Sequence, residues 1–348
     1  MWVTGGSFDA SLAGYLDALS PVFEPPENNV MGLFEFVCCL LHPSGVQGLD
    51  ENPLLESTAL IDDLTVFSRQ DLPLQDFAHP DRTRARLALL SYCHLTEADF
   101  FYDLLINLLR VRCGEQWALA PFNDLVRVIK PKKGAEKRVQ PSPNKKIERI
   151  DDYASKAAIP SVTAAFKDIY LPQVRNAVFH ADYTITETDF HMMRDLYLSP
   201  HGYLTRDVPL TELLTVVNRT FAFYYALLNR HRLATARFAH LKNKAIPFDH
   251  RLKGLIEFLF ENDEICGFHV YWPNRQSAEF TRTTTGCHAI NLSPHIQGGL
   301  SISVGMYATT PGPFSPLVEN GAQPTYTPIP GRTSSLYWPN NLAPIPVE

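Results

Sequence analysis

Residues 95–114 read LTEADFFYDLLINLLRVRCG, and this stretch decides the fold class. Its apolar residues recur at three- and four-residue spacing, which predicts an amphipathic helix. Thr96 can cap the helix start, where the acidic Glu97 and Asp99 suit the positive end of the helix dipole. Gly114 can end the helix. The stretch therefore predicts a core helix of a helical bundle.

The same spacing continues on both sides of this stretch. Pro160 interrupts one predicted helix, and Pro172 opens a short one because proline suits the first helical position. A last long helix has an aromatic apolar face, which indicates that it packs inside the bundle. The predicted helices cover residues 8–19, 31–41, 53–67, 84–93, 123–129, 151–167, a short segment that contains 175–183, and 210–237.

The composition changes after Pro247. A further helix is expected at 251–261, and then β-branched and aromatic runs at 265–272, 277–285 and 300–307 predict strands. The sequence thus predicts a mainly α protein with a smaller C-terminal α+β or β domain. We expect an N-terminal helical region (1–90) packing on a bundle (91–240), a strand-containing domain (247–310) and a Pro-rich extended tail (311–348).

The composition and the cysteine pattern indicate the type of protein and its cellular compartment. The 348 residues are 45% hydrophobic and 20% charged, which is ordinary for a folded globular protein. The first residues lack the pattern of an export signal, and no apolar run is long enough for a membrane span. Six scattered cysteines without CxxC pairs suit reduced thiols better than a disulfide framework or a zinc site. We therefore expect a cytoplasmic protein that uses no metal.

Basic residues concentrate in one segment although the net charge is −6. Residues 130–149 read KPKKGAEKRVQPSPNKKIER, a Pro-, Gly- and Lys-rich run that predicts a mobile loop. The loop is either a solvated connector or a surface that attracts RNA phosphates. The candidate RNA-binding residues are Lys130, Lys132, Lys133, Lys137, Arg138, Lys145 and Lys146.

Residues 175–183 read RNAVFHADY, an unusual amount of polar chemistry for a core helix. At about 100° per residue, Asn176 and His180 share a face, and Tyr183 follows on the same stripe. Arg175 lies beside that stripe in the first turn, where free N–H groups and the dipole reinforce its guanidinium as an anion site. The segment predicts a phosphate site with an imidazole one turn away.

These groups suit RNA cleavage without a metal or cofactor. A base takes the proton from a ribose 2′-OH, which attacks the adjacent phosphorus, and an acid protonates the leaving 5′-oxygen. One histidine serves only one of these proton transfers, so we expect a homodimer that brings two motifs together. The alternative is that His180 is a core histidine that hydrogen-bonds to Asp182 or Tyr183. If the motif is a functional site, we expect these two residues to support it.

The segment from Arg175 to His180 resembles the R-x4-6-H motif of HEPN domains, in the variant with a polar residue after the arginine. The resemblance spans about residues 90–237 and implies an HEPN-like helical bundle. It implies that Arg175 and His180 are catalytic, that Asn176 supports them, and that two motifs pair across a dimer.

HEPN domains form metal-independent RNase sites in toxins, phage-defence proteins and CRISPR-associated effectors. The resemblance therefore implies an endoribonuclease in a toxin or antiviral defence role, controlled by a regulatory or antitoxin partner. Some HEPN domains only bind or dimerise, so the alternative is a non-catalytic RNA-binding or protein-assembly module. The sequence has no GxxxxGK[ST] loop, GxGxxG turn or GxSxG elbow to indicate other chemistry.

Overall fold

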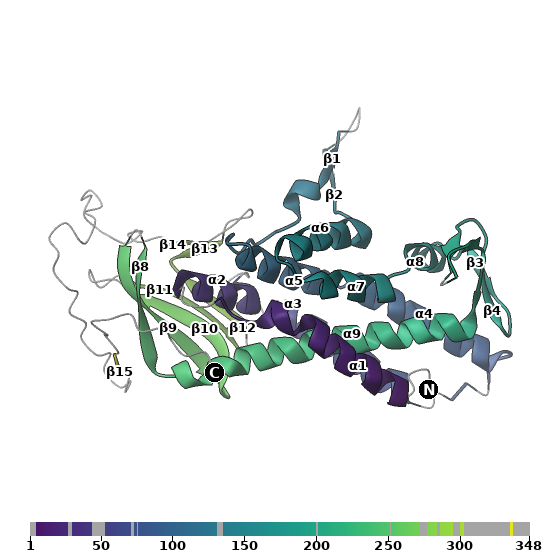
Figure 1. The fold of residues 1–348 in the computed structure, drawn as a ribbon, viewed down its shortest axis with the longest axis horizontal. Helices are drawn as coiled ribbons and strands as arrows, with labels where there is room; N and C mark the ends of the chain where they lie inside the picture. Colours follow the sequence, from purple (N-terminus) through teal and green to yellow (C-terminus); the bar gives the residue numbers. More distant parts are fainter. Residues whose placement is uncertain are drawn as a thin grey trace. The chain divides into compact units, whose positions relative to one another are not determined.

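The computed structural model shows an α+β protein, with a mainly helical N-terminal part and a C-terminal antiparallel sheet (Figure 1). This confirms the coarse fold class. The structure describes residues 5–26, 30–43, 53–70, 73–74, 76–130, 135–199, 201–250, 252–271, 277–283, 286–294, 300–302 and 335–336. None of the described helices is both long and apolar enough to cross a membrane.

The chain divides into two compact units, and neither is continuous in sequence. The helical unit comprises Met1–Val22, Leu54–Leu105 and Leu125–Arg230. The sheet unit comprises Phe23–Pro53, Ile106–Asp124 and His231–Glu348. The expected boundaries at 90, 240 and 310 stay predictions, and most of the expected tail lies outside the described residues.

Proline begins many helices of the helical unit. Pro80, Pro143, Pro160 and Pro172 each stand in the first turn of their helix, where the missing N–H costs no hydrogen bond. The helices are α1 (Gly5–Leu19), α3 (Pro53–Arg69), α4 (Pro80–Thr96), α5 (Asp99–Arg112), α6 (Pro143–Lys156), α7 (Pro160–Ile169), α8 (Pro172–Phe179) and α9 (Leu210–Ala236). The last turns of α5 and α9 belong to the sheet unit.

Aromatic side chains fill the core of the helical unit. Phe166 of α7 lies 5.9 Å from the ring of Tyr102 and 5.0 Å from that of Phe223. Phe101 meets Tyr224 edge to face at 5.4 Å. Each such pair contributes about 0.5–1.5 kcal/mol beyond its buried area. These contacts join α5, α7 and α9, so the predicted core helix does pack inside a bundle.

Short strands extend the helical unit at two places. β1 (Arg127–Ile129) and β2 (Lys137–Val139) form a two-stranded hairpin before α6. After α8, β3 (Tyr183–Ile185), β4 (Asp189–Met192) and β7 (Asp207–Pro209) form a small sheet, and β5 (Tyr197–Leu198) pairs with β6 (Leu204–Thr205). The predicted helix at 123–129 was therefore wrong, because β-branched Val128 and Ile129 extend the chain after a short 3₁₀ turn, Asn123–Leu125.

The main sheet has the order β12-β11-β10-β9-β8 with antiparallel neighbours, and the two-residue β15 (Ser335–Leu336) lies parallel to β8. Asn262 and Asp263 join β9 to β10 with positive φ values of 50° and 65°, as a tight hairpin requires. Phe34 of α2 (Val30–Leu41) meets Phe268 of β10 edge to face at 4.8 Å. The strands are β8 (Lys244–His250), β9 (Leu252–Glu261), β10 (Glu264–Tyr271), β11 (Ser277–Thr283) and β12 (Gly286–Ile290).

The helix predicted at 251–261 was wrong, because its described residues, 252–261, form β9. Positions 254–258 are all buried, including Glu257, so the strand has a continuous buried run without alternation. Such a run cannot be told from a buried helix by its period. Pro247, after which the composition changes, lies inside β8. The expected strands at 265–272 and 277–285 are β10 and β11, whereas only 300–302 of the expected strand at 300–307 is described, as β14.

Candidate functional site

Helix α8 carries the polar motif. Val174, Ala177 and Val178 bury its inner face. Leu171, which precedes the helix, donates its N–H to the phenol oxygen of Tyr92 at 2.8 Å. This bond fixes the start of α8 on α4, so the position of Arg175 in the first turn is set by buried contacts.

The end of α8 differs from the prediction. The N–H of Asp182 donates to the carbonyl of Ala177 at 2.9 Å, the N–H of Ala181 donates to that of Val178 at 3.1 Å, and Ala181 has φ of 50°. This pattern is a Schellman C-cap, which stops the helix at His180. Tyr183 therefore begins β3 and stacks on Phe190 at 4.9 Å, so its predicted place on the stripe of Asn176 and His180 was wrong.

The guanidinium of Arg175 is held by three neighbours. Its Nη2 forms an ion pair with Glu97 at the end of α4, and its Nη1 donates to Oδ1 of Asn176 at 2.9 Å. The guanidinium carbon lies 4.7 Å from the centre of the Phe179 ring. Nε of Arg175 has no hydrogen-bond partner among the described residues. Asn176 was expected to support Arg175 and His180, whereas the carboxylate of Glu97 was expected only to favour a helix start.

A polar pocket of about 580 Å³ lies at the C-terminal end of α8. His180 is exposed there, and its neighbours include the ion pair of Arg194 with Asp182, at 3.0 Å. Pairing of β3 with β4 brings Arg194 to this place, because the N–H of Met193 donates to the carbonyl of Asp182 at 3.0 Å. The pocket is lined by Asn176, His180, Asp182, Arg194 and Asp195. Arg175 is not a lining residue, but it donates a hydrogen bond to Asn176, which is one.

The predicted basic loop at 130–149 is largely ordered. The strand β2 and the helix α6 occupy most of its described part, because Pro143 starts a helix whose buried face includes Ile150 and Tyr153. Lys145 forms an exposed ion pair with Glu148 at 2.6 Å. Lys130, Lys137 and Arg138 are exposed, whereas Lys132 and Lys133 lie outside the described residues.

Lys146 is not available to RNA. It is only 4% exposed and forms an ion pair with Asp99, while its ammonium lies 5.7 Å from the ring of Tyr102. Burial raises the pKa of the neighbouring Asp103 to about 7, although Lys146 acts in the opposite direction. The predicted RNA contact by Lys146 was therefore wrong, because α6 turns this residue toward the core.

Burial also affects two other titratable groups near α8, the buried Cys93 and the half-buried Tyr170. Burial raises the pKa of the Cys93 thiol to about 12, against the effect of Arg175. The same cause raises the pKa of the Tyr170 phenol to about 12. Both groups therefore stay protonated at neutral pH. His191 lies on β4 and pairs with Asp207 of β7. Within the described part of the chain, no cluster of His, Cys, Asp and Glu side chains could hold a metal ion.

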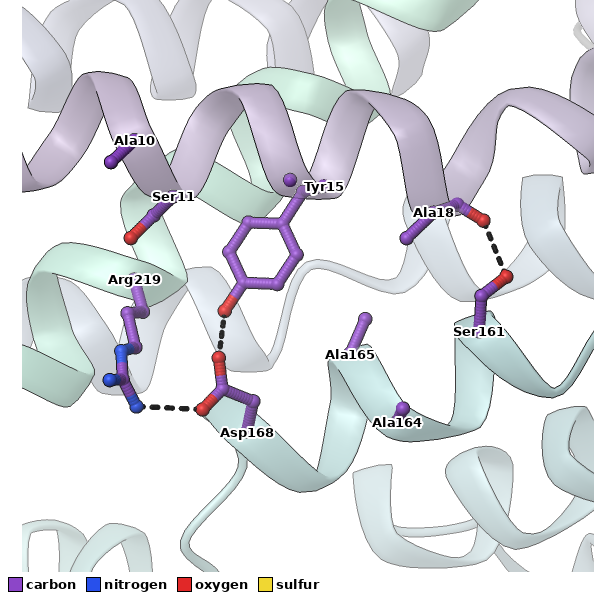
Figure 2. A pocket seen from close by; sticks show the side chains of 10 residues that line it. Ala10, Ser11, Tyr15, Ala18, Ser161, Ala164, Ala165, Asp168 and Arg219 are labelled. Carbon is purple, nitrogen blue, oxygen red and sulfur yellow. Dashed lines mark hydrogen bonds and ion pairs between the residues drawn. The ribbon is translucent and has the colours of Figure 1, made fainter.

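A second pocket of about 580 Å³ lies among α1, α7 and α9 (Figure 2). The Tyr15 phenol donates to Asp168, whose other oxygen accepts from Arg219 at 2.7 Å. Burial and this hydrogen bond raise the pKa of Tyr15. Ser161 donates to the carbonyl of Ala18 at 2.7 Å. These polar groups bind the three helices together, and the sequence did not indicate them.

In comparisons with known protein families, with curated proteins and with solved structures, no match to the chain was found.

Proposed function

We propose that the protein is a metal-independent endoribonuclease of the HEPN type, in which Arg175, Asn176 and His180 cleave RNA by attack of the 2′-OH. The observation that supports this proposal is the arrangement at α8: Asn176 and His180 line one open pocket, and Asn176 also holds Arg175. The motif residues thus come from one short helix and its C-terminal cap. The HEPN resemblance adds a toxin or antiviral defence role with a regulatory partner.

In the proposed reaction, His180 transfers a proton and Arg175 stabilises the charge that develops on the phosphate. His180 is exposed, so a substrate can reach its imidazole. Arg175 must exchange Glu97 for a phosphate oxygen, and Asn176 orients the guanidinium during that exchange. A second His180 from another copy would supply the other proton transfer, which is why we propose a homodimer.

The test is cleavage of a defined RNA by the purified full chain in EDTA. Wild type should cut the RNA and leave a 2′,3′-cyclic phosphate, and a substrate with a 2′-deoxy sugar at the cut site should bind and survive. His180→Ala should lower the rate by about 10²–10⁴-fold, the usual contribution of a proton-transfer group. His94→Ala, which removes another exposed imidazole of the helical unit, should retain the wild-type rate.

The second candidate is a non-catalytic RNA-binding or protein-assembly module. Glu97 neutralises Arg175, and Asp182 and Asp195 line the pocket, so carboxylates surround the proposed phosphate site. If wild type binds RNA without cutting it, this module is the better assignment. Cleavage that stops in EDTA, cleavage of the deoxy substrate, or an active His180→Ala variant would contradict the ribonuclease mechanism.

A further inference from the structure

The hairpin β1–β2 exposes a basic and apolar surface. Every residue of β1 and all but the last residue of β2 are exposed. Val128 and Ile129 are 50% and 53% exposed, and the cross-strand partners of these two are Arg138 and Lys137. A two-stranded hairpin without a packed face is marginally stable in water. Its composition therefore suits contact with a partner surface.

The hairpin β5–β6 exposes a second apolar surface. Leu198 and Leu204 pair across the strands and are 59% and 63% exposed. Leu196 is exposed beside them, and the exposed Tyr203 stacks on His201 at 6.2 Å. Scattered apolar residues are normal on a surface, but a group of neighbours marks an interaction site.

The segment around this second surface is acidic. We call the charged residues of 182–209 the acidic face; Glu187 and Asp207 are exposed, whereas Asp182, Asp189 and Asp195 are half-buried. Its charges oppose those of the hairpin β1–β2, and such complementarity orients one protein surface on another. The segment holds the carboxylates Asp182, Glu187, Asp189, Asp195 and Asp207 against the two arginines Arg194 and Arg206, whereas the described part of 127–139 holds Arg127, Lys130, Lys137 and Arg138 against Glu136.

The two surfaces do not meet within one copy. Figure 1 shows β1 and β2 projecting beyond α6, away from α8, β3 and β4 of the same helical unit. Complementary surfaces at different places on one molecule associate between copies. We propose that the β1–β2 hairpin of one copy docks on the acidic face of a second copy, and that the exchange is reciprocal in a closed dimer.

This docking also bears on the proposed ribonuclease, and in this respect alone it rests on the proposed function. Asp195 belongs both to the acidic face and to the pocket of His180. A docked hairpin brings Lys137 and Arg138 beside that pocket. The two arginines already there are neutralised by ion pairs, Arg175 with Glu97 and Arg194 with Asp182. The second copy thereby supplies the positive charge that an RNA phosphate needs.

The test is sedimentation of the full chain at micromolar concentration without RNA. Wild type should be a dimer, and the double variant Lys137→Glu, Arg138→Glu should be a monomer with unchanged circular dichroism. Adding Glu187→Lys and Asp195→Lys to that variant should restore the dimer, since both surfaces then have reversed charge. The control Arg86→Glu, Lys167→Glu reverses two exposed bases elsewhere on the helical unit and should stay dimeric.

A monomeric wild type overturns the proposal, and so does a double variant that remains dimeric. The proposal is also overturned if the quadruple variant, in which both surfaces have reversed charge, stays monomeric. Because sedimentation needs no RNA, the result separates this proposal from the ribonuclease. A dimer that never cuts RNA contradicts only the proposed function, and an RNA-cutting double variant that remains dimeric contradicts only the docking.

Discussion

Glu97 determines how much positive charge Arg175 offers to a ligand, because the two side chains form a partly buried ion pair with exposures of 32% and 21%. We predict that Glu97→Gln lowers the free energy of unfolding by about 1–3 kcal/mol, since it leaves a guanidinium short of its partner. Urea denaturation of Glu97→Gln, Arg175→Gln and the double variant measures this coupling. Glu148→Gln, in the exposed pair with Lys145, should cost less than about 1 kcal/mol. Additive effects of the Glu97 and Arg175 substitutions would show that the pair contributes nothing.

The motif residues could be predicted from the sequence because helical spacing alone brings Asn176 and His180 to one face. Their partners could not. Glu97 meets Arg175 across 78 positions of the chain, and Arg194 reaches Asp182 only through the pairing of β3 with β4. Such contacts depend on how elements pack, and no periodic pattern records them.

The C-terminal ends of α6 and α8 use the same cap with alanine in the left-handed position. Ala158 has φ of 56° and Ala181 has φ of 50°, and both are exposed. An alanine in the left-handed region costs about 1–2 kcal/mol of folding free energy. Glycine avoids this cost, but it offsets part of the gain because it has more conformational freedom in the unfolded chain. We predict that Ala158→Gly and Ala181→Gly each raise the free energy of unfolding by about 0.5–1 kcal/mol. Ala157→Gly, at φ of −79°, should lower it in the same denaturation experiment.

The helices were largely predictable because proline marks several of their starts and apolar spacing marks their buried faces. Their ends were less so. The cap after His180 rests on an alanine, which carries no glycine signal, and the prediction therefore ran on to Tyr183. The basic segment looked like a loop from its composition, although Pro143 opens α6 within it. Strand β9 was missed because it is buried on both faces.

The two units are interleaved along the chain. Truncating the chain at the domain boundary expected near Pro247 would therefore divide the sheet unit. The sheet unit takes Phe23–Pro53 and Ile106–Asp124 in addition to the C-terminal strands. Within it, Phe34 packs on Phe268, and the guanidinium of Arg282 donates to the carbonyl of Leu41 at 2.9 Å. Composition along the sequence cannot reveal this, because α2 resembles any other apolar helix.

We therefore predict that a fragment ending at residue 240 does not fold like the full chain. Removing β8–β12 uncovers the side of α2 that packs on the sheet, where the buried Phe34 meets Phe268. Exposed apolar area of this kind costs about 25 cal/mol per Å² and promotes aggregation. The fragment should bind the dye ANS and lack the sharp thermal transition that we expect of the full chain by circular dichroism. A fragment that unfolds cooperatively near the transition temperature of the full chain would instead support separate domains in sequence order, as composition alone suggests.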